Sequence, residues 1–354
     1  MAIRNIREAR QCLKAHGVPF KGSANVPKTR TRSLTERQRN LLVDMGQGFD
    51  GPVYQLRETL GGDIFDAVTL DASHNELQKM YGSVPDDWRS IAKVRTTPDF
   101  KTINSARLGG LSNLDTVPEN AGYKLKEQTD EKVSYTPTKK GNLLSISLEA
   151  SYGDAIGAFK EEVGLLGKAA KNTLNEFVLG SLFDDNPTCD YDTTALFDAA
   201  HSNYDTGAAL SHDNLQAGIA AIMNQTGVAG EQIYLRPTFL AVNPARMVLA
   251  NELIKSATQE SGAAAIPTMS YIPKVLMPTV MASPHLNADS KDWYLMTDHP
   301  VVEVSFVRGQ TEPEIIQEPE STGRSFTTDS ITWKVRHSYG GDVIDHRGAY
   351  HGEE

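Results

Sequence analysis

The sequence predicts an α+β fold, because helical and strand-like segments are mixed along the chain without the regular alternation of parallel α/β domains. Three observations lead to this prediction. One helical pattern covers residues 154–184, strand-type sequence fills 97–103 and 133–148, and shorter helices and strands follow irregularly after residue 210.

The long helix is the element around which we expect the rest of the chain to be organised. Its apolar residues recur at helical spacing; they are Ile156, Phe159, Val163, Leu166, Ala170, Leu174, Phe177, Val178 and Leu182. Ser151 or Asp154 can cap its start, and Asn186-Pro187 ends it. At ~1.5 Å per residue, 154–184 would be about 46 Å long.

Four glycines lie inside this helical pattern, at 157, 164, 167 and 180. Each costs roughly 1 kcal/mol of helix stability relative to alanine, so tertiary packing must hold the helix. Two interpretations follow. The helix is either the core helix of an ordinary globular domain, or a strut that crosses a thin, extended subunit.

Residues 96–148 predict a long two-stranded ribbon, with strands at 97–103 and 133–148 and a polar connection rich in turn residues. The ribbon has few apolar residues of its own, and an isolated hairpin is marginally stable in water. It must therefore lie on another surface. That surface is either its own domain or an adjacent subunit.

Residues 1–95 show little regular core pattern, so we interpret them as an arm. Short helices are expected at 3–16 and 33–44, a mixture of short helices and turns at 56–81, and a helical turn from Pro85 to Trp88.

The part after the long helix predicts a helix at 211–225, a strand at 233–242, and a helix opened by Asn243-Pro244 that runs to about Ile254. In that last helix Val248, Leu249 and Leu253 are expected to face inward. Strands are expected at 301–307 and 330–337.

Charge is unevenly distributed along the 354 residues, whose formal net charge is −10. Residues 1–40 hold ten Lys/Arg and two Asp/Glu, whereas the remaining chain holds 25 and 43. A body this acidic is a poor general nucleic-acid binder, because phosphate contacts need excess cation. The basic arm either docks on an acidic surface of a neighbouring copy, touches nucleic acid, or stays solvated. Its candidate contact residues are Arg4, Arg7, Arg10 and Lys14.

No stretch of the sequence is apolar and long enough to predict a membrane span, and the N-terminal sequence lacks the apolar core of a secretory signal. The two cysteines, Cys12 and Cys189, are too few for a disulfide framework or a zinc site. We therefore expect synthesis in a reducing cytoplasm.

No catalytic or nucleotide-binding motif withstands inspection. Gly164 to Lys168 resembles part of a phosphate loop but lacks its spacing and lies mid-helix. Asp198, His201 and Ser202 are near one another in sequence, which is not triad geometry, and His201 is expected to be a loop histidine that bonds backbone.

Metal-binding patterns are equally weak. The acidic residues that could gather a hard cation lack EF-hand spacing; they are Asp184, Asp185, Asp190, Asp192 and Asp205. The histidines His337, His346 and His351 fit no metal spacing either. We expect no catalytic site, no cofactor and no metal, which favours a structural or assembly role.

Three stretches carry a resemblance to a known family. They are Val117-Pro118-Glu119-Asn120 with Tyr123, the segment 196–203 with sequence LFDAAHSN, and the C-terminal stretches 309–313 and 329–348, which end in VIDHRG. In order and spacing these stretches resemble tailed-bacteriophage major capsid proteins of the Mu-like major head subunit type, over roughly residues 95–350.

The resemblance implies a fold with an N-terminal arm (1–95), an extended E-loop ribbon (96–148), a P-domain (149–186 and 300–354) holding the spine helix, and an A-domain (187–299). It implies a structural head protein, without enzymatic activity, that self-assembles into an icosahedral shell around double-stranded DNA. Hexamers and pentamers of the chain would form the shell, with portal and scaffolding proteins as partners and decoration proteins as a further candidate partner.

The same resemblance places the protein in the virion, after synthesis in the bacterial host cytoplasm, with no membrane and no sequence-specific DNA binding. Glu119, Tyr123 and Lys124 in the ribbon become candidate intersubunit contacts, together with the basic arm. Two alternatives remain: the shell of a cellular encapsulating compartment with the same fold, and an α+β enzyme with an unrecognised site.

Overall fold

The computed structural model describes residues 62–108, 114, 116–120, 122–123, 125, 130–147, 156–255, 258–261, 266–269, 278–286, 291–318, 327–328 and 330–354. The chain folds into two compact units. The first comprises Met1–Pro85, Lys139–Asn172 and Gln310–Ser338, and the second comprises Asp86–Thr138, Thr173–Gly309 and Tyr339–Glu354. The four-part division expected from the sequence stays a prediction.

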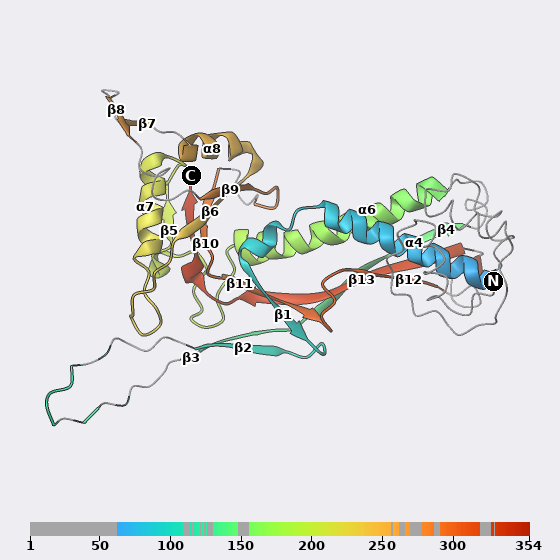
Figure 1. The fold of residues 1–354 in the computed structure, drawn as a ribbon, viewed down its shortest axis with the longest axis horizontal. Coiled ribbons are helices and arrows are strands. Elements are labelled where there is room, and N and C mark those ends of the chain that lie inside the picture. Colours follow the sequence, from blue (N-terminus) through green and yellow to red (C-terminus); the bar gives the residue numbers. More distant parts are fainter. Residues whose placement is uncertain are drawn as a thin grey trace, which may run out of the picture. The chain divides into compact units, whose positions relative to one another are not determined.

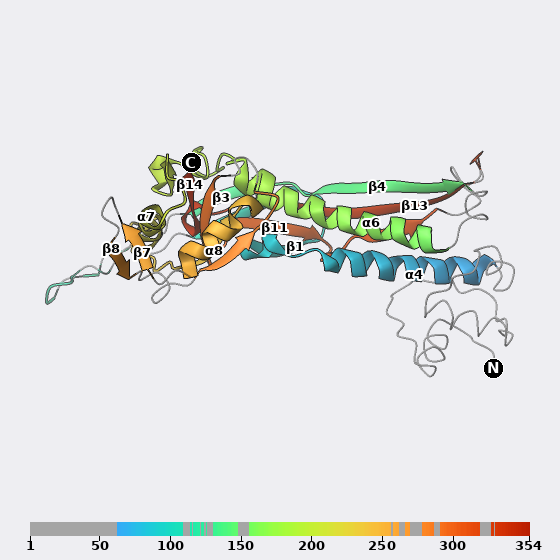
Figure 2. The same cartoon turned by 90° about the horizontal axis from the view of Figure 1, so that it is seen from above.

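The first unit is a small sheet covered by two helices (Figures 1 and 2). Its helices are α4 (Gly62–Ser83) and most of α6 (Ile156–Asn175). Its strands are β4 (Thr138–Ser147), β12 (Glu314–Gln317) and the first part of β13 (Ser330–Val343). β12 runs antiparallel to β13 with Ile315 opposite Val335, and β4 also pairs with β13.

The core of the first unit consists of Leu77 from α4, Val163 from α6, and three residues of the sheet, Ile315, Trp333 and Val335. The sequence prediction of short helices and turns at 56–81 is therefore wrong, because a single 22-residue helix occupies 62–83. The expectation of little core pattern is wrong for residues 73–95, where Leu77, Tyr81, Trp88 and Ile91 are buried. The helices expected at 3–16 and 33–44 lie outside the described residues.

The helix escaped prediction because the sequence of α4 has no clear apolar stripe. Figure 2 shows α4 beside α6, where Gly167 of α6 lies so close that an added Cβ would stand 2.5 Å from the carbonyl oxygen of Leu77. Tyr81, buried in the next turn of α4, donates its hydroxyl to the carbonyl oxygen of Thr311 at 3.1 Å.

The second unit contains a five-stranded sheet in the order β5-β14-β10-β6-β9. These strands are β5 (Tyr204–Thr206), β14 (Ala349–Glu353), β10 (Trp293–Thr297), β6 (Pro237–Val242) and β9 (Thr279–Ala282). The helix α7 (His212–Met223) packs on β14, and α8 (Met247–Lys255) packs on β6 and β9.

Further elements of the second unit surround this sheet. β1 (Ala92–Thr97) runs parallel to β11 (Val302–Val307), which pairs antiparallel with the end of β13. Short 3₁₀ helices connect these elements: η1 (Asp87–Ser90), η3 (Ala199–His201), η4 (Pro244–Arg246) and η5 (His346–Gly348). A separate hairpin consists of β7 (Thr258–Ser261) and β8 (Ile266–Met269).

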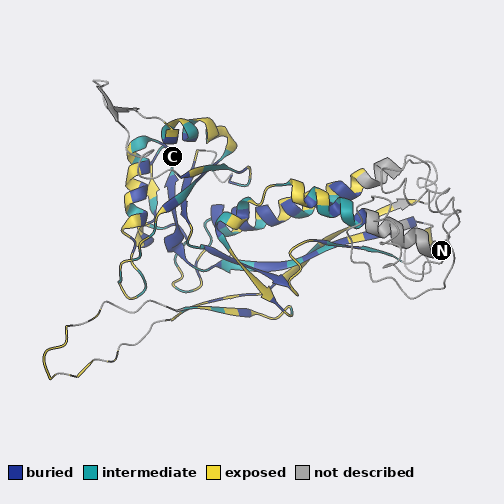
Figure 3. Cartoon of the chain, in the orientation of Figure 1, coloured by how far each residue is buried: buried dark blue, intermediate teal, exposed yellow. Residues whose placement is uncertain are grey.

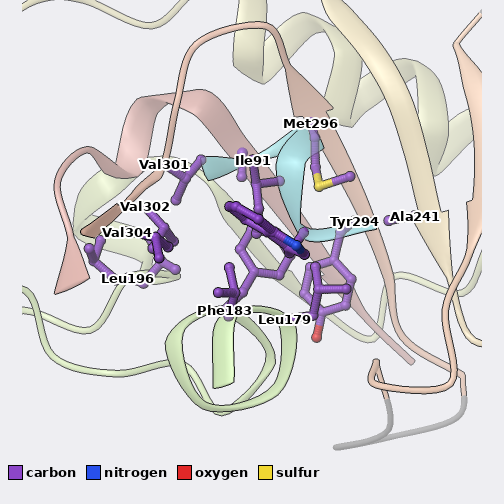
Figure 4. Packing of buried hydrophobic residues seen from close by; sticks show 14 of the residues in the cluster. Ile91, Leu179, Phe183, Leu196, Ala241, Tyr294, Met296, Val301, Val302 and Val304 are labelled. Carbon is purple, nitrogen blue, oxygen red and sulfur yellow. The ribbon is translucent and has the colours of Figure 1, made fainter. Parts of the chain in front are cut away.

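Two apolar clusters form the core of the second unit. Figure 3 shows β10 and β11 as buried strands, and every residue of both is buried. Figure 4 shows the larger cluster, in which Phe183 and Leu179 lie near Tyr294; Met296 and residues of β11 belong to the same cluster. The second cluster lies under α7 and α8 and includes Leu215, Trp293 and Ile254.

The long helix predicted over 154–184 is confirmed for its described part. α6 passes without a break into η2 (Glu176–Asp184), while residues 154 and 155 lie outside the described residues. The sequence did not reveal that η2 is a π-helix, in which the amide of Asp185 donates to the carbonyl oxygen of Gly180 at 2.9 Å.

π-Helices are rare and are mostly single turns, so a nine-residue segment needs a physical reason. Here the wider winding buries Val178, Leu179 and Phe183 together. It also places the Asp184 carboxylate 2.7 Å from the Tyr294 hydroxyl, which donates to it.

The predicted ribbon exists, but its strands are displaced from the expected positions. β2 (Ile103–Leu108) pairs antiparallel with β3 (Asp130–Tyr135), so the first strand begins where the prediction ended it. Pro98 explains the shift, because its missing amide ends β1 before the ribbon begins. Pro137 likewise separates β3 from β4, and β4 pairs with β13 instead of with the ribbon.

The local signals after residue 210 predicted most elements well. Ser211 caps α7 by accepting from the amide of Asn214, and Asn243 caps η4 by accepting from the amide of Ala245. The inward orientation of Val248 is wrong, since 69% of this residue is exposed and the buried residues of α8 are Ala250 and Ile254. β6 starts at residue 237, not at 233.

Within the described part of the chain, no helix combines the length and apolar character needed to cross a membrane.

The close approach of α4 and α6 predicts the effect of two glycine substitutions. Gly167→Ala forces its Cβ against the backbone of Leu77, so we expect the free energy of unfolding to fall by about 1–3 kcal/mol. Gly164→Ala is the matched control. Its Cβ would meet only the flexible Met80 side chain, and alanine favours the helix by about 1 kcal/mol. Chemical denaturation of the subunit measures both, and equal effects would contradict the close backbone contact.

Candidate functional site: an anchored ribbon with an exposed tip

The outer part of the ribbon exposes large apolar side chains to solvent. The exposed fractions are 99% for Leu114, 90% for Tyr123 and 95% for Leu125. Glu119 and Asn120 are exposed too, and Asn120 has a positive φ of 63°. Several exposed apolar groups on one thin element are typical of an interaction surface rather than of a solvated loop.

The inner part of the ribbon, in contrast, lies on its own chain. Ile103 of β2 and Val133 and Tyr135 of β3 form a small buried cluster against which Tyr191 packs. Both the amide and the hydroxyl of Ser134 also donate to the Asp190 carboxylate, at 3.2 and 3.3 Å. The base of the ribbon, formed by β2 and β3, is therefore folded back on its own chain. The tip, represented by the described residues between 114 and 125, exposes its side chains, and its contact with an adjacent subunit stays a prediction.

One buried carboxylate gathers donors from both ribbon strands. Glu303, the second residue of β11, is 1% exposed. It accepts from the Tyr135 hydroxyl at 2.7 Å and from the Ser105 hydroxyl at 3.2 Å. Arg95 and Lys93 lie 3.3 and 3.9 Å from its oxygens and neutralise its charge. Burial and the hydrogen bond to Glu303 raise the pKa of Tyr135, so this hydroxyl remains a donor.

A second polar group, the anchor cluster, joins the ribbon to the C-terminal turn; it consists of Arg107, Glu131, Asp345 and Arg347. Arg107 of β2 contacts both its cross-strand neighbour Glu131 and Asp345. Arg347 lies 3.1 Å from Asp345 and 3.9 Å from Glu131. Burial and the nearby Arg347 lower the pKa of Arg107.

Asp345 is the N-cap residue of η5, the turn that contributes Asp345 and Arg347 to this cluster. Its carboxylate caps η5 by accepting from the amide of Arg347 at 3.1 Å, and His299 Nε2 lies 2.7 Å from its other oxygen. Burial, followed by the two arginines, lowers the pKa of His299. Arg347 also donates to the carbonyl oxygen of Thr226 at 2.7 Å, which fixes its guanidinium.

The segment 196–203 meets this turn from the other side. The Asn203 side chain donates to the carbonyl oxygens of Leu196 and His346, at 2.9 and 3.2 Å. His201 Nδ1 lies 3.1 Å from the Leu196 carbonyl oxygen, which confirms the prediction of a backbone-bonding loop histidine. Its Nε2 lies 2.7 Å from Asp192 rather than from Asp198. Two stretches that carried the family resemblance, 196–203 and the C-terminal turn, are therefore in direct contact although they are distant in the sequence.

The residues Asp192, His201 and His346 bring potential metal ligands within 4.8 Å of one another. The rings of His201 and His346 are stacked at 3.7 Å with an interplanar angle of 1°. A histidine lone pair lies in the ring plane, and zinc sits ~2.0–2.1 Å from it, so one ion cannot lie in both planes. The His346 Nδ1 already faces the Tyr191 hydroxyl at 2.8 Å, and burial with the adjacent His201 lowers the pKa of His346 to about 2. The arrangement is a structural stack.

The sequence-predicted contact residues fall into two groups. Glu119 and Tyr123 lie in the exposed part of the ribbon. Lys124 and the four residues of the basic arm (Arg4, Arg7, Arg10 and Lys14) lie outside the described residues.

Sequence reasoning missed Glu303, Arg107 and Glu131 as anchors. A charged residue in the mostly apolar 301–307 strand was the available signal for Glu303. For Asp345 and Arg347, the signal was the D-x-R-G ending itself.

Comparison with known proteins adds a family and a fold. Residues 130–352 match a family model described as phage capsid protein. Two similar solved structures come from Microbacterium phage Oxtober96 and Mycobacterium phage Bobi. The first has a TM-score of 0.51 at 8% identity and covers 76% of this chain and 90% of that chain. The second has a TM-score of 0.50 at 11% identity and covers 75% and 89%.

An encapsulin complex from Synechococcus elongatus is similar at a TM-score of 0.48 and 9% identity, over 77% of this chain and 88% of that chain. No curated protein matches the sequence. The phage structures share the fold predicted from the sequence, a mixed α+β capsid fold.

The Glu303 anchor predicts a specific effect of removing one hydroxyl. Tyr135→Phe takes away a hydrogen bond to a buried carboxylate, so we expect a loss of about 1.5–3 kcal/mol of subunit stability and faster amide exchange in β3. Tyr123→Phe, in the exposed part of the same ribbon, is the control and is expected to change stability by less than about 0.5 kcal/mol. If both variants unfold at the same denaturant concentration, Glu303 does not anchor the ribbon.

Proposed function

This chain belongs to the phage capsid protein family, and from that premise we propose that it is the major head subunit of a tailed phage, which self-assembles into an icosahedral shell enclosing double-stranded DNA. The carrying observation is the family match over 130–352, which includes the ribbon strand β3, the long helix and the C-terminal turn. It is a capsid shell protein, and its role is structural.

The ribbon supports assembly through contacts between copies. Its base is fixed on its own chain by Glu303 and Asp345, whereas Leu114, Tyr123 and Leu125 remain exposed. A neighbouring copy that covers these side chains would gain their burial, at about 25 cal/mol per Å² of apolar surface. Many modest contacts of this kind sum in a closed symmetric assembly, while each stays reversible during assembly.

We assign Glu119, Tyr123 and Lys124 to this contact between copies. The basic arm, through Arg4, Arg7, Arg10 and Lys14, is proposed as a second contact that docks on the acidic body of a neighbour. Hexamers and pentamers of the chain would form the shell, with portal, scaffolding and decoration proteins as further partners.

The acidic body fits a wall that faces packed DNA. Beyond residue 40 the chain holds 25 Lys/Arg and 43 Asp/Glu, so DNA phosphates are repelled rather than held. DNA is then enclosed without sequence-specific binding, and the protein belongs to the virion after synthesis in the bacterial host cytoplasm.

The Mu-like major head subunit type is the finer assignment that we favour. Its support is the pairing of the LFDAAHSN segment with the C-terminal D-x-R-G turn, in which Asn203 bonds the backbone of His346. These two stretches carried the resemblance in the sequence, and they form one structural unit here.

Electron microscopy of the purified chain tests the proposed function. We expect closed shells above a threshold concentration, and shells from infected or packaging cells should protect DNA from nuclease. Discrete small particles at every concentration would overturn assembly. Shells that never protect DNA but retain a bound enzyme would instead indicate a cellular compartment.

Substitutions in the exposed part of the ribbon test the contact between copies. Tyr123→Ser with Leu125→Ser removes two exposed apolar side chains, so we expect an unchanged subunit melting temperature and at least a tenfold higher threshold concentration for shells. Tyr234→Ser is the matched control, because Tyr234 is 97% exposed but lies outside the ribbon. Normal shells from the double variant, or an equal defect in the control, would contradict the assignment.

A further inference from the structure

The anchor cluster contains two positive and two negative charges that are largely removed from water. The exposed side-chain fractions are 20% for Arg107, 17% for Glu131, 3% for Asp345 and 10% for Arg347. Arg107 and Glu131 come from opposite strands of the ribbon, and the other two residues come from the C-terminal turn. The cluster therefore bridges the ribbon and the body with no net charge.

The contacts alternate in sign, since each arginine touches both carboxylates. Arg107 contacts Glu131 and Asp345, and Arg347 lies 3.1 Å from Asp345 and 3.9 Å from Glu131. A planar guanidinium directs its donors in fixed directions. These alternating contacts therefore favour one direction of the ribbon relative to the turn.

Attachment of the ribbon does not require these charges. Ile103, Val133 and Tyr135 already bury apolar surface at the base, and Glu303 holds the same strands. Buried ion pairs add little net stability compared with apolar residues of similar volume, because the desolvation cost cancels most of the attraction. What such a cluster can add is a single, defined geometry of the two segments that it joins, here the ribbon and the C-terminal turn.

We propose that the anchor cluster sets the direction of the ribbon before assembly, with Arg107 as its central positioning residue, so that the exposed tip is presented to a second copy of the chain in one orientation. This inference rests on the proposed function, in which the tip contacts a neighbouring copy. A ribbon held in its binding direction loses less conformational freedom on docking, which strengthens assembly without any added contact.

The test removes one charge of each sign and keeps the Arg347–Asp345 pair. In the Arg107→Met, Glu131→Met variant, we expect the denaturation midpoint of the subunit to remain at the wild-type value. The threshold concentration for shells should rise at least tenfold. If the double variant does not fold, Arg107→Lys replaces it in the test, because lysine keeps the charge but loses the planar guanidinium. The same denaturation midpoint and the same rise in the shell threshold are expected.

A distance measurement on the dilute, unassembled subunit separates direction from stability. Spin labels at Tyr123→Cys and Ser181→Cys, in a Cys12→Ser background, report the ribbon relative to η2, where Ser181 is exposed. One narrow distance distribution is expected with the intact cluster, and a broad one with the variant. An unchanged narrow distribution, or normal assembly of the variant, would overturn the proposal.

Arg246 and Glu354 provide a matched control ion pair in the second unit, with a separation of 2.8 Å. Replacing both with Met should leave the distance distribution and the shell threshold unchanged, and an equal effect there would also overturn the proposal. If the wild-type chain formed no shells, the proposed function would fail, whereas the spin-label comparison would still decide whether the cluster directs the ribbon.

Discussion

The burial of carboxylates beneath the ribbon is the constraint on which the site depends. A carboxylate removed from water is costly unless donors surround it, and Glu303 and Asp345 are 1% and 2% exposed. Both meet this requirement by taking donors from the ribbon and from the body at once, through Tyr135 and Arg95 in one case and Arg107 and Arg347 in the other. Detachment of the ribbon base would therefore remove donors from both buried carboxylates, whereas Leu114, Tyr123 and Leu125 in the tip are exposed.

In η2, side-chain packing likewise overrides the usual preference of the backbone for the α-helical winding. From Glu176 to Asp184 the chain adopts the rare π winding because this winding buries Phe183 among Phe197 and Tyr294. Centroid distances of 5.0 to 5.5 Å link these three rings, within the range of favourable aromatic pairs. The carboxylate of Asp184 then reaches Tyr294, so the unusual winding satisfies a polar group as well as the core.

Local sequence signals predicted the elements that local chemistry controls. The caps at Ser211 and Asn243 and the end of the long helix before Asn186-Pro187 needed only neighbouring residues to be recognised. The helix at 62–83 was missed because its partner surface, the glycine face of α6, is distant in the sequence.

In the candidate site, too, local sequence predicted some features, whereas features that depend on contacts between distant residues could not be predicted. The exposed turn of the ribbon could be recognised from its polar, turn-rich sequence. The anchors could not, because Arg107, Glu303 and Asp345 meet their partners only after the chain has folded. The stack of His201 on His346 is likewise invisible to spacing rules, which compare only residues that are near in sequence.

The position of β14 within its sheet has a consequence for synthesis. This strand lies between β5 and β10, and it follows directly after the turn that holds Asp345 and Arg347. A ribosome that has made the ribbon and the long helix has therefore not yet made the strand that joins the sheet or the carboxylate that fixes the ribbon. The anchor cluster and this sheet are therefore completed only when the C-terminal residues emerge, after the ribbon and the long helix have been synthesised.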